Sequence, residues 1–235
     1  MSAIHFVGGE KGGVGKSLLS RLLSQYFLDR SMPYIGLDAD QSHPTLSRYY
    51  GDFTRPINLD FFESTDQIME LALATEQNLV IDLPAQSQRF LDRWIEDNGV
   101  LEMCADMQIP LVYWYVVDDG RDSVGLLDGF LTKYRDHLQC VVVKNQGRGT
   151  DFSEIEGLAV LNDTDSAGRL RQLTLPALHA ATIRRIEKLN FSFWAAEHVK
   201  DGDAQHLSLM ERQRTKVWVK KAYAMIDDVV GRTFT

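Results

Sequence analysis

The stretch that decides the fold is GGEKGGVGKS, residues 8–17. An apolar run from Ala3 to Val7 predicts a short buried strand before it, and the apolar spacing over residues 18–23 predicts a helix after it. A phosphate-binding loop needs this context, because glycines let backbone N–H groups crowd around an anion and the helix N-terminus adds donors. Lys16 is then placed to reach the β- and γ-phosphates, and the Ser17 hydroxyl to bind Mg²⁺. A glycine-rich turn without a nucleotide is the alternative.

Two further apolar segments end in carboxylates. Residues 33–37 predict a strand that leads into Asp38 and Asp40, and residues 78–82 predict a strand that ends in Asp82. In an open α/β sheet, polar residues just past the carboxyl ends of the strands face the ligand crevice. We therefore expect Asp38 and Asp82 to hold Mg²⁺ beside the phosphate loop. A solvated turn and a structural aspartate are the respective alternatives.

Strand-like and helix-like segments alternate along the 235 residues. This order predicts an α/β fold with a mostly parallel central sheet flanked by helices, in one domain spanning residues 1–235. Aromatic residues between positions 46 and 62 are expected to pack in the core rather than to stack on bases. The remaining expected strands lie at 111–117, 138–143 and 173–175, and the expected helices at 64–73, 90–107 with a break at Gly99, 124–137, 180–190 and 208–230.

Composition narrows the class of protein. The net charge of −8 argues against a generally basic surface, yet residues 184–235 carry 10 Lys/Arg against 7 Asp/Glu, which permits a local basic patch. The sequence has no run of about 18 apolar residues, as a membrane-spanning helix requires. Cys104 and Cys140 are isolated in apolar segments and are expected to be buried reduced thiols in a cytoplasmic protein.

The phosphate loop has a lysine at position 11 and a glutamate, Glu10, where the general pattern has glycine. KGGVGKS, residues 11–17, resembles the deviant Walker A motif of the ParA/MinD family of ATPases. Residues 38–40 are similar to the family's switch I, and residues 82–85 to its Walker B strand and switch II. The resemblance implies a SIMIBI-like P-loop NTPase fold and slow, Mg²⁺-dependent ATP hydrolysis in which Asp40 acts on water. It also implies an ATP-bound homodimer in which Lys11 contacts phosphate across the interface.

The same resemblance implies the remaining nucleotide contacts. The phosphates would be bound by Gly12, Gly13, Val14, Gly15, Lys16, Ser17 and Leu18. The adenine would be contacted by Asn145, at the end of a predicted strand, and by the backbone near Pro176. A side-chain amide can pair with both donor and acceptor atoms of adenine. For Asn145 the alternative is a turn residue before Gly147.

ATP-bound dimers of this family bind DNA non-specifically through basic residues. The candidates in this chain are Arg184, Arg185, Lys188, Lys216, Lys220 and Lys221, and ordinary solvated helix faces are the alternative. We therefore expect a short ParA-like ATPase in plasmid partition, stability or conjugative transfer, on the nucleoid or free in the cytoplasm, with a partner protein that stimulates hydrolysis.

Two other functions stay open. One is a MinD-like positioning ATPase that recruits a protein partner to a membrane or cell pole without binding DNA. Membrane anchoring is not expected, because residues 227–235 hold two acidic residues and one basic residue, a poor match to anionic lipid. The other is a metabolic ligase or kinase on the same nucleotide fold, which the placement of Lys11 disfavours.

Overall fold

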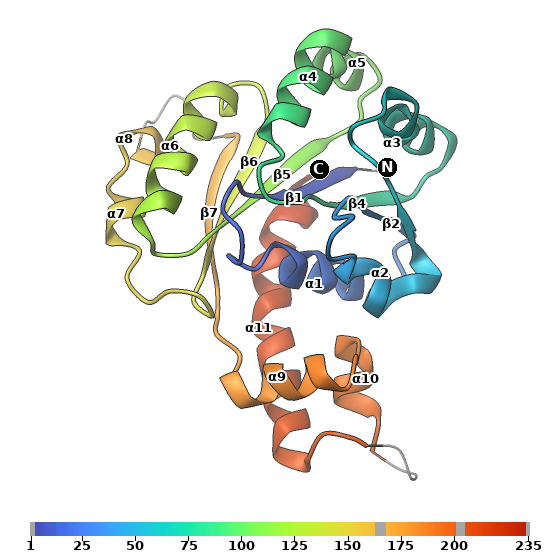
Figure 1. Ribbon diagram of the computed structural model, residues 1–235, viewed down its shortest axis with the longest axis vertical. Helices are drawn as coiled ribbons and strands as arrows, with labels where there is room; N and C mark the ends of the chain where they lie inside the picture. Colours follow the sequence, from blue (N-terminus) through green and yellow to red (C-terminus); the bar gives the residue numbers. More distant parts are fainter. Residues whose placement is uncertain (1–2, 163–167, 201–204, 234–235) are drawn as a thin grey trace.

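The computed structural model describes residues 3–162, 168–200 and 205–233 (Figure 1). In this part of the chain, seven parallel strands form one sheet in the order β3-β2-β4-β1-β5-β6-β7, which confirms the predicted α/β fold. The strands are β1 (Ile4–Gly8), β2 (Tyr34–Asp38), β3 (Thr54–Pro56), β4 (Asn78–Asp82), β5 (Leu111–Val117), β6 (Gln139–Asn145) and β7 (Leu170–Leu175).

Helices cover both faces of the sheet (Figure 1). The helical segments are α1 (Lys16–Asp29), α2 (Thr45–Tyr50), η1 (Gly51–Phe53, a 3-10 turn), α3 (Phe62–Ala74), α4 (Gln88–Asn98), α5 (Val100–Asp106), α6 (Arg121–Tyr134), α7 (Ser153–Glu156), α8 (Ala159–Asn162), α9 (Ala180–Lys188), α10 (Phe193–His198) and α11 (Leu209–Thr233). Among the described residues, no helix has the length and apolar character needed to span a membrane. The last two residues of the tail considered for membrane binding, 234–235, lie outside the described ranges.

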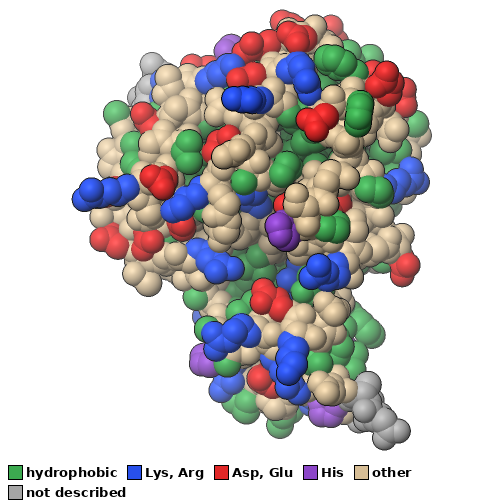
Figure 2. Space-filling model, in the orientation of Figure 1, with side chains coloured by type: hydrophobic (Ala, Val, Ile, Leu, Met, Phe, Trp, Pro, Cys, Tyr) green, Lys and Arg blue, Asp and Glu red, His purple; other side chains and the backbone are tan. Residues whose placement is uncertain are grey.

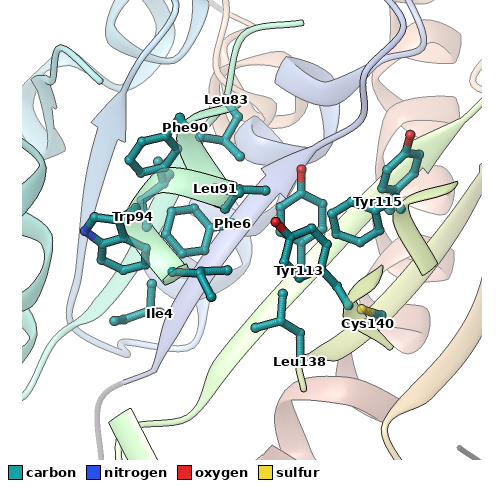
Figure 3. Close-up of a cluster of buried hydrophobic side chains, with 14 of the residues drawn as sticks. Ile4, Phe6, Leu83, Phe90, Leu91, Trp94, Tyr113, Tyr115, Leu138 and Cys140 are labelled. Atoms are coloured by element: carbon teal, nitrogen blue, oxygen red, sulfur yellow. The ribbon is translucent and has the colours of Figure 1, made fainter. Parts of the chain in front are cut away.

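Two apolar cores follow from the alternation of side chains along the central strands. Phe6 of β1 packs with Trp94 and Tyr113 under α3 to α8, in the cluster drawn in Figure 3. Val7, the next residue, faces the opposite core, where α1 and the second half of α11 pack. Because β1 is buried on both faces, its residues are apolar on both sides except for His5, as is usual for a central parallel strand.

A small lobe extends beyond the sheet and is built from α9, α10 and the first half of α11 (Figure 1). Ile186, Ala196 and Leu207 form its own apolar cluster. The second half of α11 anchors the lobe, because its apolar side chains, from Trp218 to Val230, join the core under α1. Helix α10 was not among the predicted elements.

Three expectations need correction. Helix α3 begins at Phe62 rather than at Ser64, and the Thr65 hydroxyl bonds back to the Phe62 carbonyl instead of capping the helix. Tyr50 is buried as expected, but the large side chains at positions 53, 61 and 62 are about half exposed, because they lie in η1, in the loop after β3 and at the start of α3, at the edge of the sheet. The apolar spacing within the helix expected at 208–230 predicts a packed face that includes Val217, but this side chain of α11 is 45% exposed and lines a surface groove.

His5 on β1 makes the fold sensitive to acid. Its ring is fully buried, and its Nδ1 accepts a hydrogen bond from Trp114 Nε1 at 3.2 Å. Burial lowers the pKa of His5 to about 4 from its usual 6.5. Between those pH values the unfolded chain binds a proton at this residue that the folded chain does not, so the contribution of His5 to the free energy of unfolding falls as the pH drops from 6.5 toward 4.

We expect a loss of about 3 kcal/mol over that range from this group, measured by urea unfolding at a series of pH values. The free energy of unfolding of wild type minus that of His5→Gln should fall by this amount over the range, while the difference between wild type and His43→Gln, at an exposed histidine, should stay constant. An equally steep profile in His5→Gln would contradict the assignment.

Candidate functional site

The glycine-rich loop joins β1 directly to α1, at the carboxyl edge of the sheet. Gly9, Gly13 and Gly15 have φ values of 141°, 78° and 108°, in the region that L side chains rarely adopt. A Cβ at Gly15 would lie 2.3 Å from Asn145 Nδ2, whereas a Cβ at Gly12 or Gly13 would meet nothing within 4 Å. The loop is therefore packed against the protein at one end and borders open space at the other, as a cradle for an anion requires.

Lys16 starts α1 with a buried ammonium group. Its Nζ donates to the Lys11 carbonyl oxygen at 2.9 Å, and it is in no ion pair within the described residues. Burial lowers the pKa of Lys16, although the nearby Asp82 carboxylate opposes that change. A buried cation at a helix N-terminus is well suited to an anionic ligand.

Asp38 and Asp82 end adjacent strands and are register partners in the sheet. Burial raises the pKa of Asp82 to about 7, while hydrogen bonds from the Ser20 and Ser17 hydroxyls lower it. Asp82 Oδ1 accepts from Ser20 Oγ at 2.9 Å, and the buried Oδ2 has no partner in the part of the chain described. The structure thus brings the predicted magnesium ligands Ser17, Asp38 and Asp82 together, and an orphaned carboxylate oxygen fits a cation there.

Asp38 also holds the segment that follows it. Its Oδ2 accepts from the Ser47 backbone N–H in α2 at 2.8 Å. Asp40 Oδ1 accepts from the backbone N–H groups of Ser42 and His43, so this carboxylate organises a turn. Asp40 also lies close enough to Lys16 for its charge to raise the pKa of that lysine. Within the described residues, three His, Cys, Asp or Glu side chains do not come together as a metal site of their own.

Lys11 is held by a carboxylate to which the sequence analysis gave no role. Its Nζ lies 3.0 Å from both oxygens of Asp118, which directly follows β5. Burial alone would raise the pKa of Asp118, but hydrogen bonds from Ser123 and Lys11 outweigh it and hold that pKa below its usual value. A Cβ at Gly120 would fall 2.4 Å from Lys11 Nζ. A carboxylate just past an apolar strand is the same signal that identified Asp82, and it would have found Asp118.

Glu10 connects the loop to the segment after β4. Its backbone oxygen accepts from Gln86 N at 3.2 Å, and its Oε1 accepts from Gln88 N at 2.9 Å, at the start of α4. Burial raises the pKa of Glu10. The residue that replaces the expected glycine therefore ties the glycine-rich loop to the predicted switch II.

A cavity of about 290 Å³ opens beside the loop. Gly15, Leu18, Asn145 and Pro176, all predicted nucleotide contacts, line it. Asn145 Nδ2 donates to the Val14 carbonyl at 2.7 Å, and its Oδ1 accepts from Gly147 N at 2.9 Å. Each polar atom of this amide keeps the capacity for one more hydrogen bond.

The basic candidates do not share one face. Arg184 lines the cavity beside the loop. Lys216 lies near Glu197 of α10, whereas Lys221 lines a groove beside Pro176 on another side of α11. Figure 2 shows basic side chains scattered over the lobe, with acidic ones between them. Within the described residues, none of Arg184, Arg185, Lys188, Lys216, Lys220 and Lys221 is in an ion pair.

A parallel sheet with a glycine loop between β1 and α1, and aspartates at the ends of β2 and β4, has the layout of a P-loop nucleotide-binding fold. No family model matches the chain. It is similar to protein TraL of Escherichia coli, with 26% identity over 97% of this chain and 98% of that protein. A second TraL protein of the same species is 28% identical, again over 97% and 98% of the two chains.

Protein MobD of Acidithiobacillus ferrooxidans is 29% identical over 55% of this chain and 57% of its own length. Among solved structures, the chain is similar to a nucleotide-binding protein from Archaeoglobus fulgidus in complex with ADP. That similarity has a TM-score of 0.45 and 14% identity, over 87% of this chain and 94% of the other.

The packing at Gly15 predicts which loop glycines tolerate a side chain. Gly15→Ala combines a positive φ with a clash against Asn145, so the melting temperature should fall by at least about 3 °C in thermal unfolding. Gly12→Ala is the matched control, because its Cβ enters open space, and its melting temperature should stay within about 1 °C of wild type. Equal effects at the two positions would contradict the geometry.

Proposed function

We propose that the chain is a ParA-like ATPase that pairs when ATP binds and acts in plasmid transfer or mobilisation. The observation that carries the proposal concerns two buried groups near the glycine loop. Among the described residues, the Lys16 ammonium is in no ion pair and Asp82 Oδ2 has no hydrogen-bond partner. A buried ionisable group without a counter-charge is costly, and it is stabilised when a ligand supplies that charge. Mg²⁺-bound nucleotide phosphates would supply both.

The residues present fit that ligand. Backbone N–H groups of residues 12–18 and Lys16 would hold the phosphates, and Ser17, Asp38 and Asp82 would hold Mg²⁺. Asn145 and Pro176 border a cavity for the base. Bound Mg²⁺ would neutralise phosphate charge, and Asp40 is the group that would orient or deprotonate water.

Lys11 would link the ligand to pairing of two chains. Its ion pair with Asp118 is partly exposed, with 30% of the lysine side chain accessible, and such pairs contribute about 0–1 kcal/mol. A triphosphate in a second subunit would attract the ammonium more strongly than one carboxylate does. Asp118 therefore competes with that phosphate for the same cation.

The similarity to TraL and MobD favours transfer or mobilisation over the other roles expected from the sequence. Contact with DNA would use exposed basic side chains on the lobe, among them Lys188, Lys220 and Lys221. A positioning ATPase that recruits a protein without DNA is the second candidate. The scatter of the basic residues over several faces favours it.

Size measurement by light scattering tests the switch, with Mg²⁺-ATP, with ADP and without nucleotide. We expect wild type to be a monomer that dimerises with ATP, Lys11→Ala to stay monomeric, and Asp40→Ala to form a dimer that persists. Asp118→Asn should dimerise at an up to roughly fivefold lower protein concentration, because the competing carboxylate is gone. Asp128→Asn, an exposed acidic residue on α6, is the control and should match wild type. An Asp40→Ala protein that never dimerises would contradict the assigned roles.

Retention on random-sequence duplex DNA separates the two candidate functions. We expect retention only with ATP and a steep loss as salt rises, since each neutralised phosphate adds about −0.9 to the slope of log K against log salt. The double variant Lys220→Ala, Lys221→Ala should weaken retention and reduce that slope, whereas Arg89→Ala, on α4, should not. Retention on vesicles or a partner protein but not on DNA would favour the positioning function.

A further inference from the structure

A separate cavity of about 440 Å³ lies between α1, α2, η1 and α10, and we call it the aromatic–acidic pocket. Its walls include the rings of Tyr49, Phe53 and Trp194 and the carboxylates of Asp29 and Asp52. In Figure 1, α10 lies below α1 and α2, so segments far apart in the sequence meet here. No residue of this pocket lines the cavity beside the glycine loop.

The aromatic rings are held in place before any ligand arrives. Phe53 stacks on Tyr34 with ring centroids 5.9 Å apart, and Trp194 stacks on His198 at 4.9 Å. Even so, Phe53 is 45% and Trp194 54% exposed. Large exposed rings whose positions are already set can bind a ligand with little loss of side-chain entropy.

The carboxylates bring negative charge that this part of the chain does not neutralise. Within the described residues, neither Asp29 nor Asp52 forms an ion pair. Asp29 is oriented by hydrogen bonds from Gln25 Nε2 and the Tyr223 hydroxyl. Two arginines lie nearby but are engaged: Arg30 pairs with Asp227, and the buried Arg21 lies against the Tyr49 ring at 3.6 Å.

We propose that the aromatic–acidic pocket binds an arginine side chain carried by a partner protein. A guanidinium stacks on aromatic faces and donates to carboxylates in a planar fork, which suits a pocket lined by Phe53, Trp194 and Asp52. Lysine offers a point charge without the planar stacking, and nucleic-acid phosphates are repelled by the two carboxylates. This site goes beyond the proposed nucleotide chemistry and uses none of its residues.

Nucleotide-free protein is titrated with a fluorescent 12-residue peptide that alternates glycine and arginine, and with matched glutamine and lysine versions. Binding is followed by anisotropy at low and moderate salt. We expect the arginine peptide to bind at least tenfold more tightly than the glutamine peptide, and more tightly than the lysine peptide. Asp52→Asn and Trp194→Ala should each weaken the arginine peptide roughly fivefold. Asp128→Asn, which removes one exposed charge on α6, should leave its affinity unchanged.

The indole N–H signals in an NMR spectrum locate the binding site. The chain has four tryptophans, and only Trp194 is exposed, since Trp94, Trp114 and Trp218 are buried. The indole signal that is missing from the Trp194→Phe spectrum belongs to Trp194. In wild type this signal should move when the arginine peptide is added, while the other three stay in place. Movement of the Trp218 signal alone would place the peptide in the groove beside Pro176 and overturn the proposal. An equal loss of affinity in Asp128→Asn and Asp52→Asn would also overturn the proposal, because it would mean that the peptide is attracted by the general negative charge of the protein.

Discussion

Two ionisable groups that are buried without an ion pair among the described residues decide which ligand the site can bind. Within the described residues, the Lys16 ammonium donates to one backbone carbonyl and one oxygen of Asp82 has no hydrogen-bond partner. Burial weakens the charged form of both, which is why the pKa of the lysine falls and that of the aspartate rises. A fold that needed only stability would place apolar side chains there, so these groups favour a charged ligand as their missing partner.

The parallel sheet explains why distant residues meet at this point. The strands are parallel, so their carboxyl ends lie at the same edge of the sheet. The residues that follow the apolar runs therefore lie in a row along that edge. Asp38 and Asp82 become register neighbours although they are 44 positions apart in the sequence. Asp118 and Asn145 extend the line on the other side of β1, beyond the glycine loop.

This regularity is also what made much of the molecule predictable. Apolar runs gave β5 at residues 111–117 and located β1, β2 and β4, and the residues that follow them gave the carboxylates of the site. What the sequence did not reveal are pairings with no local pattern. Lys11 and Asp118 are 107 positions apart, and Glu10 bonds to a backbone N–H of Gln88, which any residue type except proline would offer. Short segments near the sheet edge were also missed, because three-residue β3 carries too few side chains to show a period.

Gly120 leaves the Lys11 ammonium almost no clearance, since even a methyl group there would sit 2.4 Å from the nitrogen. The lysine tip can move aside at small cost, whereas the backbone at residue 120 cannot. A side chain at this position would therefore displace the Lys11 ammonium from its present contact with Asp118. With alanine at this position no charge would change, and the glycine loop would keep its own sequence. A substitution at residue 120 would thus change how firmly Asp118 holds Lys11, although residue 120 lies outside the glycine loop and is not a predicted magnesium ligand.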